Sequence, residues 1–77
     1  MQDALEIVAA NVRRLRKERS LTQDELAARA SMDPAEIRRI ESARRDPGTR
    51  VLTRIADGLG VPPSSLLKGA GTTTRER

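Results

Sequence analysis

Residues 22–42 read TQDELAARASMDPAEIRRIES, and this stretch decides how the chain folds. It opens with a helix start signal, because Thr22 is followed three residues later by Glu25. Such a pair fits a capping box, in which the N-cap hydroxyl and the later carboxylate each accept a hydrogen bond from a free amide at the helix start. The signal predicts a short helix over 23–30.

A second start signal follows closely. Asp33 and Glu36 stand at capping-box spacing, and Pro34 occupies the first helical position, where a missing amide does no harm. These residues predict a second short helix over 34–42, also opened by a capping box. The two helices and the tight turn between them have the length of a helix-turn-helix unit, 23–42.

The rest of the chain is also predicted to be helical, because its apolar residues recur three and four positions apart. Further helices are expected over 4–18 and 49–59, with a last short helix over 63–68. Residues 69–77 are small and polar, which is typical of a disordered tail. The expected fold class is therefore all-α, a compact five-helix domain over 1–68.

The composition argues against an enzyme. The chain has 77 residues, 36% of them hydrophobic, and it contains no aromatic residue, no cysteine and no histidine. Thiolate nucleophiles, imidazole bases and the usual zinc ligands are therefore excluded, and no paired carboxylates stand in a recognisable catalytic arrangement. We expect no cofactor, no metal site and no small-molecule ligand. Because the sequence has neither a long apolar run nor a signal peptide, we expect no membrane association and a cytoplasmic location.

The charge favours duplex nucleic acid as the partner. Fifteen Lys+Arg against eleven Asp+Glu give a net charge of +4, and all the cations except Lys17 and Lys68 are arginine. Arginine makes planar, two-pronged hydrogen bonds to phosphates and to guanine. Single-strand binding is disfavoured, because it relies on bases stacking on aromatic side chains.

Several segments in the right order resemble the lambda-repressor-like, Cro-type (xenobiotic-response-element type) helix-turn-helix family of bacterial and phage regulators. Residues 21–27, LTQDELA, are similar to the opening of the family's first motif helix. Residues 40–47, IESARRDP, are similar to the exit of its second helix, and 52–61, LTRIADGLGV, to its fourth helix and stop. The resemblance covers about residues 8–68 and implies a sequence-specific regulator that binds duplex DNA as a homodimer.

The resemblance also implies which residues contact DNA. The family lays its second motif helix in the major groove and reads bases from its first turns. Arg39 is the residue we expect to read guanine. The positions that match base contacts are Pro34, Ala35, Arg38 and Arg39. The positions that match phosphate contacts are Thr22, Gln23, Arg44, Arg45 and Arg50.

Other matched positions carry structural expectations. Arg16 is expected to form a structural ion pair with Glu41. Ser31 and Ala43 replace glycines that are common in the family, so either a left-handed backbone is adopted at some cost or the turn differs slightly. Pro34 has no hydrogen-bond donor, so readout is expected to depend on the arginines and on DNA shape.

The last apolar pair, Leu66 and Leu67, is expected either to close the core or to form the dimer interface. The alternative to a regulator is a protein-interaction module, such as an antitoxin or anti-regulator, whose main partner is another protein. A nonspecific nucleoid protein would need a larger positive excess. Among small regulators of this kind, which include phage repressors and antitoxins, the short length favours a restriction–modification controller.

Overall fold

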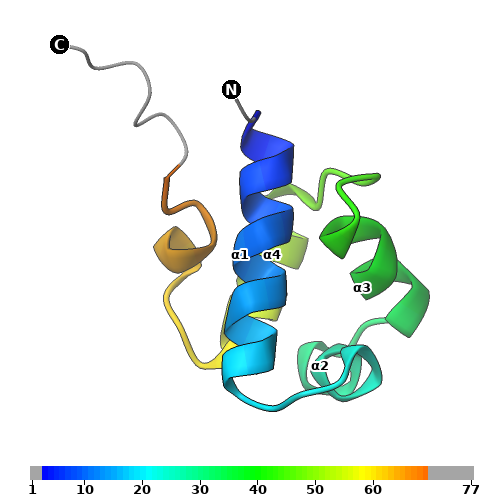
Figure 1. Cartoon of the computed structure of the whole chain (residues 1–77). Coiled ribbons are helices and arrows are strands. Elements are labelled where there is room, and N and C mark those ends of the chain that lie inside the picture. Colours follow the sequence, from blue (N-terminus) through cyan, green and yellow to red (C-terminus); the bar gives the residue numbers. More distant parts are fainter. Residues whose placement is uncertain (1–2, 70–77) are drawn as a thin grey trace, which may run out of the picture.

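The helix-turn-helix stretch folds as two short helices that pack against each other (Figure 1). The protein is described by a computed structural model, which covers residues 3–69. Its elements are α1 (Ala4–Glu18), α2 (Gln23–Ala30), α3 (Pro34–Glu41), α4 (Gly48–Leu59) and the 3-10 turn η1 (Pro63–Leu66). The all-α class is confirmed. The expected tail lies outside the described residues, apart from Gly69.

The predicted fifth α-helix is wrong. Residues 63–68 form only the single 3-10 turn η1, so the described chain has four α-helices. The Asn11 side-chain amide of α1 donates to the carbonyl oxygens of Leu66 at 2.8 Å and Lys68 at 3.0 Å. These carbonyls are therefore held by a side chain across the molecule, where a continuing helix would bind them through its own amides.

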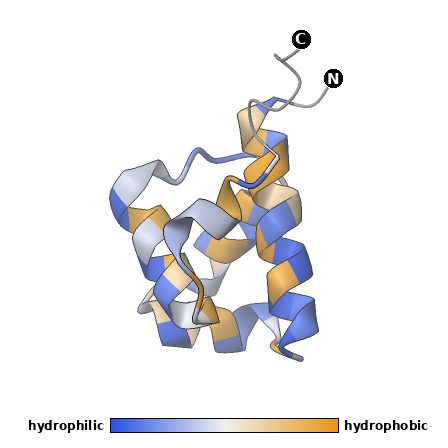
Figure 2. Ribbon diagram, turned by 90° about the vertical axis from the view of Figure 1, so that its left-hand side faces the viewer, coloured by the Kyte–Doolittle hydropathy of each residue, from blue (hydrophilic) through white to orange (hydrophobic). Residues whose placement is uncertain are grey.

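The helices share one aliphatic core. Hydrophobic and hydrophilic residues alternate along each helix, as Figure 2 shows, so that one face of each can be buried. Ala27 of α2 is fully buried, in keeping with the small side chain that a close helix crossing requires. Gly58 of α4 marks a second close approach, because an added Cβ there would lie 3.3 Å from the Ala30 nitrogen. The largest fully buried side chains are Leu26, Ile37, Ile40, Ile55, Leu66 and Val12.

The capping boxes observed at the helix starts agree only in part with those predicted from the sequence. The Thr22–Glu25 capping box of α2 is confirmed, with hydrogen bonds of 3.0 and 2.8 Å. An equivalent box opens α1, where Asp3 and Glu6 cap each other's amides, and the sequence analysis missed it.

The expected second capping box, at α3, is incomplete. Asp33 Oδ1 accepts from the Ala35 amide at 2.8 Å, but Glu36 does not return a bond to the Asp33 amide. The Glu36 carboxylate instead lies beside the guanidinium group of Arg45, with 3.0 Å between Oε1 and Nη1. A charged partner attracts a carboxylate more strongly than a neutral amide does, so the cap is given up.

Three helices end in a left-handed residue that is not glycine. Ser20, Ser31 and Ala43 have φ of 56°, 56° and 60°, whereas α4 ends at Gly60 with φ of 73°. After Ser31, the Met32 amide donates to the Ala27 carbonyl at 2.8 Å, which closes the end of α2. Of the two alternatives for this turn, the strained left-handed backbone is therefore the one observed.

Candidate nucleic-acid interface

The exposed face of α3 carries the cationic side chains of the candidate site. Ile37 and Ile40 are buried, and this spacing turns Arg38 and Arg39 toward solvent. A shallow hollow of about 240 Å³ lies beside them. It is lined by Ala35, Arg38, Arg39, Ser42 and Arg44. Three of the predicted DNA-contacting arginines and Ala35 therefore meet at one place, while Pro34, at the start of α3, is only partly exposed.

Arg39 and Arg45 are joined through Glu36. Arg45 Nη1 lies 3.0 Å from Glu36 Oε1, and Arg39 Nη1 lies 3.6 Å from Glu36 Oε2. One carboxylate thus lies between an arginine of α3 and an arginine of the loop that follows. The sequence analysis missed this role of Glu36. The available signal was a glutamate three residues before Arg39 on α3, with a second arginine, Arg45, in the loop that follows the helix.

The predicted pair of Arg16 and Glu41 lies behind the interface and holds α3 against α1. Arg16 Nε donates to Glu41 Oε2 at 2.6 Å, and Arg16 Nη2 donates to Oε1 at 3.0 Å. The hydrogen bond and the charge of Glu41 raise the pKa of the Arg16 guanidinium, outweighing the opposite effect of burial. Arg13 also donates to the Glu41 carbonyl oxygen. The pair is a positioning element and does not face the hollow.

The residues predicted to contact phosphate from the starts of α2 and α4 differ in exposure and in hydrogen bonding. Thr22 is exposed at the start of α2, and its hydroxyl oxygen caps the helix while the hydroxyl proton stays available. Gln23 is partly buried, and its side-chain amide nitrogen donates to Glu41 Oε1 at 3.1 Å. Its side-chain carbonyl oxygen takes no part in that contact. Arg50 is exposed in the first turn of α4.

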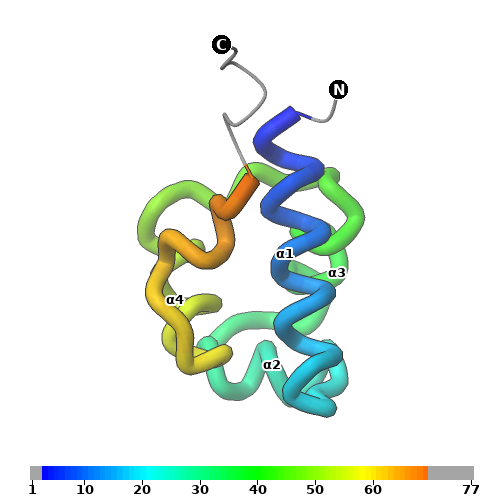
Figure 3. The backbone as a smooth tube through the Cα atoms, turned by 60° about the vertical axis from the view of Figure 1, so that its left-hand side comes forward, coloured from blue at the N-terminus to red at the C-terminus, as the bar shows by residue number. Residues whose placement is uncertain are grey.

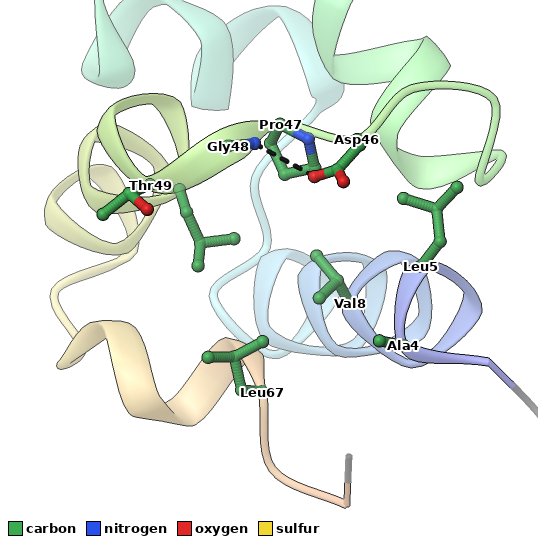
Figure 4. A pocket seen from close by; sticks show the side chains of 9 residues that line it. Ala4, Leu5, Val8, Asp46, Pro47, Gly48, Thr49 and Leu67 are labelled. Carbon is green, nitrogen blue, oxygen red and sulfur yellow. Dashed lines mark hydrogen bonds between the residues drawn. The ribbon is translucent and has the colours of Figure 1, made fainter. Parts of the chain in front are cut away.

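The structure separates the two leucines of the expected dimer interface. Leu66 is fully buried, so its assignment to an interface is wrong: it closes the core. Leu67 is 44% exposed and borders an apolar hollow of about 440 Å³, drawn in Figure 4. Leu5 and Val8 of α1 line the hollow across from the start of α4, where Asp46 Oδ1 accepts from the Gly48 amide at 3.1 Å.

The two hollows share no lining residue. In Figures 1 and 3, η1 and α3 lie on opposite sides of α1. The cationic hollow is built on α3, and the apolar hollow adjoins the residue after η1. The apolar hollow is also lined by Asp46, Pro47 and Gly48, so it begins next to the loop that carries Arg44 and Arg45.

A helix-turn-helix unit whose second helix presents a cationic exposed face defines a DNA-binding domain. The family model described as Helix-turn-helix matches residues 12–66, and this chain belongs to that Cro/C1-type family. The family consists of DNA-binding transcriptional regulators and not of enzymes. In residues 3–69, no helix has both the length and the apolar character needed to cross a membrane.

Individual similar proteins support the family assignment. The chain is 37% identical over 59 residues to y4dJ of Sinorhizobium fredii, an uncharacterized HTH-type transcriptional regulator, with 77% of each chain covered. The wild-type restriction-modification controller protein C.Esp1396I is similar in structure, with a TM-score of 0.79, 26% identity and 88% of both chains covered. The controller C.AhdI from Aeromonas hydrophila has the same fold, with a TM-score of 0.78, 24% identity and coverage of 80% of this chain and 94% of that one.

Proposed function

We propose that this regulator binds a palindromic duplex operator as a homodimer, with α3 in the major groove. The observation that carries the proposal is the meeting of Arg38, Arg39 and Arg44 around one open hollow on the exposed face of α3. Arg39 takes guanine O6 and N7 together, and Arg38 reaches a base or a phosphate beside it. Ala35 contributes an apolar contact to a thymine methyl group, and Pro34 packs against the groove without donating a hydrogen bond.

Backbone contacts orient α3 on the duplex. Thr22 and Gln23 lie at the start of α2, where the helix dipole favours a phosphate. The other side chains assigned to phosphates are Arg44, Arg45 and Arg50. All three are exposed, and they follow α3 in the chain, so they extend the cationic surface beyond its hollow.

The homodimer is proposed to form through Leu67 and the apolar hollow beside it. One domain of this size contacts too little DNA for tight specific binding, and two-fold pairing doubles the contacts on a palindrome. Leu67 is the large hydrophobic side chain that the described chain exposes, and it adjoins a hollow lined by Leu5 and Leu52. Pairing there leaves α3 free for DNA, because η1 and α3 lie on opposite sides of α1 (Figure 3).

Within the family, we propose a controller type of regulation. Two of the similar structures are restriction-modification controller proteins. A regulator of this kind responds to its own concentration through dimerisation and operator occupancy. The regulator acts in the cytoplasm, where its operator DNA lies.

Selection of bound sites from a random duplex pool, at two salt concentrations and with tagged protein, tests the proposal. Enrichment of a palindrome with half-sites about one helical turn apart is the expected result. Binding without enrichment that disappears at high salt would show phosphate attraction only, and would direct the search to a protein partner.

A further inference from the structure

We propose that Glu36 is a positioning residue that sets the sequence specificity of the interface, by aiming Arg39 and by restraining Arg45. The inference rests on the proposed function, in which Arg39 reads a base and Arg45 binds a phosphate. Glu36 itself is assigned no contact with DNA. Its effect is exerted through the two arginines whose guanidinium groups lie on either side of its carboxylate.

One oxygen of this carboxylate is shielded from solvent, although the side chain as a whole is 29% exposed. Glu36 Oε1 is buried and accepts no directed hydrogen bond from the described residues, so its partner is the positive charge of Arg45 at 3.0 Å. The capping bond that this position predicts, to the Asp33 amide, is absent from α3. Glu36 therefore gives up a helix cap and keeps a buried oxygen, and both features are explained by the arginines that it holds.

The two contacts differ in a way that suits their roles. Arg45 is the closer partner and its side chain is 43% exposed, whereas Arg39 lies at 3.6 Å and is 56% exposed. Arg45 is therefore the anchored cation, and Arg39 is oriented but easily transferred to a stronger acceptor. A guanine edge offers two acceptors in the plane of the guanidinium, which one distant carboxylate oxygen does not.

Charge explains how the same carboxylate disfavours random DNA. Without Glu36, Arg39 and Arg45 would repel each other, and each would be free to seek the nearest phosphate. Phosphates are present in every sequence, so freed arginines raise affinity without discrimination. Glu36 also brings a negative charge close to the DNA, which weakens any complex in which the arginines do not replace it with better contacts.

The test compares Glu36→Gln with Glu18→Gln on the selected operator and on random duplex over a range of salt. Both variants remove one negative charge, but Glu18 lies on α1 in an exposed pair with Arg14 at 3.2 Å. Glu36→Gln should bind random duplex several-fold more tightly, with a salt slope steeper by about 0.9, as expected for one more phosphate contact. The ratio of operator to random affinity should fall about tenfold, within the range of one base contact.

Glu18→Gln should change both affinities in parallel and leave their ratio within about twofold, as expected for a charge remote from the bases. An unchanged ratio in Glu36→Gln would overturn the proposal. Failure of the wild-type protein to enrich any site would instead refute the proposed function, so the two failures are distinguishable.

Two further variants separate positioning from other roles. In an Arg39→Ala/Arg45→Ala background, Glu36→Gln should no longer lower the affinity ratio, because both of its targets are gone; a persistent loss would mean that Glu36 reads a base itself and would overturn the proposal. Glu36→Asp retains the charge but is too short to hold both arginines, so it should lower the ratio as Glu36→Gln does. It also keeps the proposal testable if Glu36→Gln unfolds, which far-ultraviolet circular dichroism would show.

Discussion

Glu41 Oε2 of α3 lies 2.6 Å from Arg16 Nε of α1, and this pair fixes α3 to α1. The Glu41 side chain is only 3% exposed, and its other oxygen accepts from Arg16 and from Gln23, the first residue of α2. One carboxylate thus ties α1, α2 and α3 together. The orientation of the helix-turn-helix unit depends on this contact as well as on the aliphatic core.

Replacing Glu41 by alanine should destabilise the fold by about 3 kcal/mol, because it leaves the largely buried Arg16 cation without its partner. Thermal or denaturant unfolding measures the change. The double variant Arg16→Met/Glu41→Leu should recover more than half of the loss, since an apolar pair carries no unpaired charge. Equal destabilisation in the single and double variants would show that packing, and not charge compensation, is what Glu41 supplies.

The sequence predicted those features that depend on neighbours in the chain. The Thr22–Glu25 cap and the outward direction of Arg38 follow from local spacing, and the structure has both. Glu36 was assigned to a cap because its competing partner, Arg45, belongs to a loop beyond α3. Whether Leu66 or Leu67 is buried was likewise not decidable from spacing.

A long-range contact accounts for another difference between the predicted and the observed fold, at the last helix. The expected last helix is a single 3-10 turn, and the Asn11 amide that holds it lies 55 positions earlier in the chain. No local pattern in residues 63–68 reports that contact. The placement of the candidate site residues on their helices was predictable where a family motif fixes it, whereas the pairing of charges around them required the three-dimensional arrangement.

Ala43→Gly should stabilise the protein by about 1 kcal/mol, because alanine pays a steric cost in the left-handed conformation that glycine does not. Ala43 has φ of 60°, and its amide donates to the Ile40 carbonyl at 3.1 Å to close α3. The melting temperature should rise by roughly 4–8 °C for a domain of this size. Ala28→Gly, at an exposed position inside α2, is the matched control and should destabilise by a similar amount. A fall in the melting temperature of Ala43→Gly would show that the left-handed backbone at Ala43 carries no such steric cost.

Arg39→Ala should weaken operator binding by about 1–3 kcal/mol and relax the preference at one base position. The reason is the loss of a two-pronged contact to guanine, so affinity for random duplex should change much less. Titrations on operator variants with single base changes locate the affected position. Arg14→Ala, which removes an exposed arginine of α1, is the control for charge alone. Parallel losses on operator and random duplex would remove Arg39 from base reading.

Leu67→Asp should convert the proposed dimer to a monomer without unfolding it. The side chain is 44% exposed and borders the apolar hollow, so a charge there opposes burial between two copies but disturbs little in one. Sedimentation equilibrium over a concentration series measures the association, and the stability of the monomer should stay within about 0.5 kcal/mol of the wild type.

Ser64→Asp places the same charge on η1 at an exposed polar site, and it should leave the dimer intact. Operator binding by Leu67→Asp should fall at least about tenfold, because each half-site must then be occupied independently. A Leu67→Asp protein that still sediments as a dimer would place the two-fold contact on another surface.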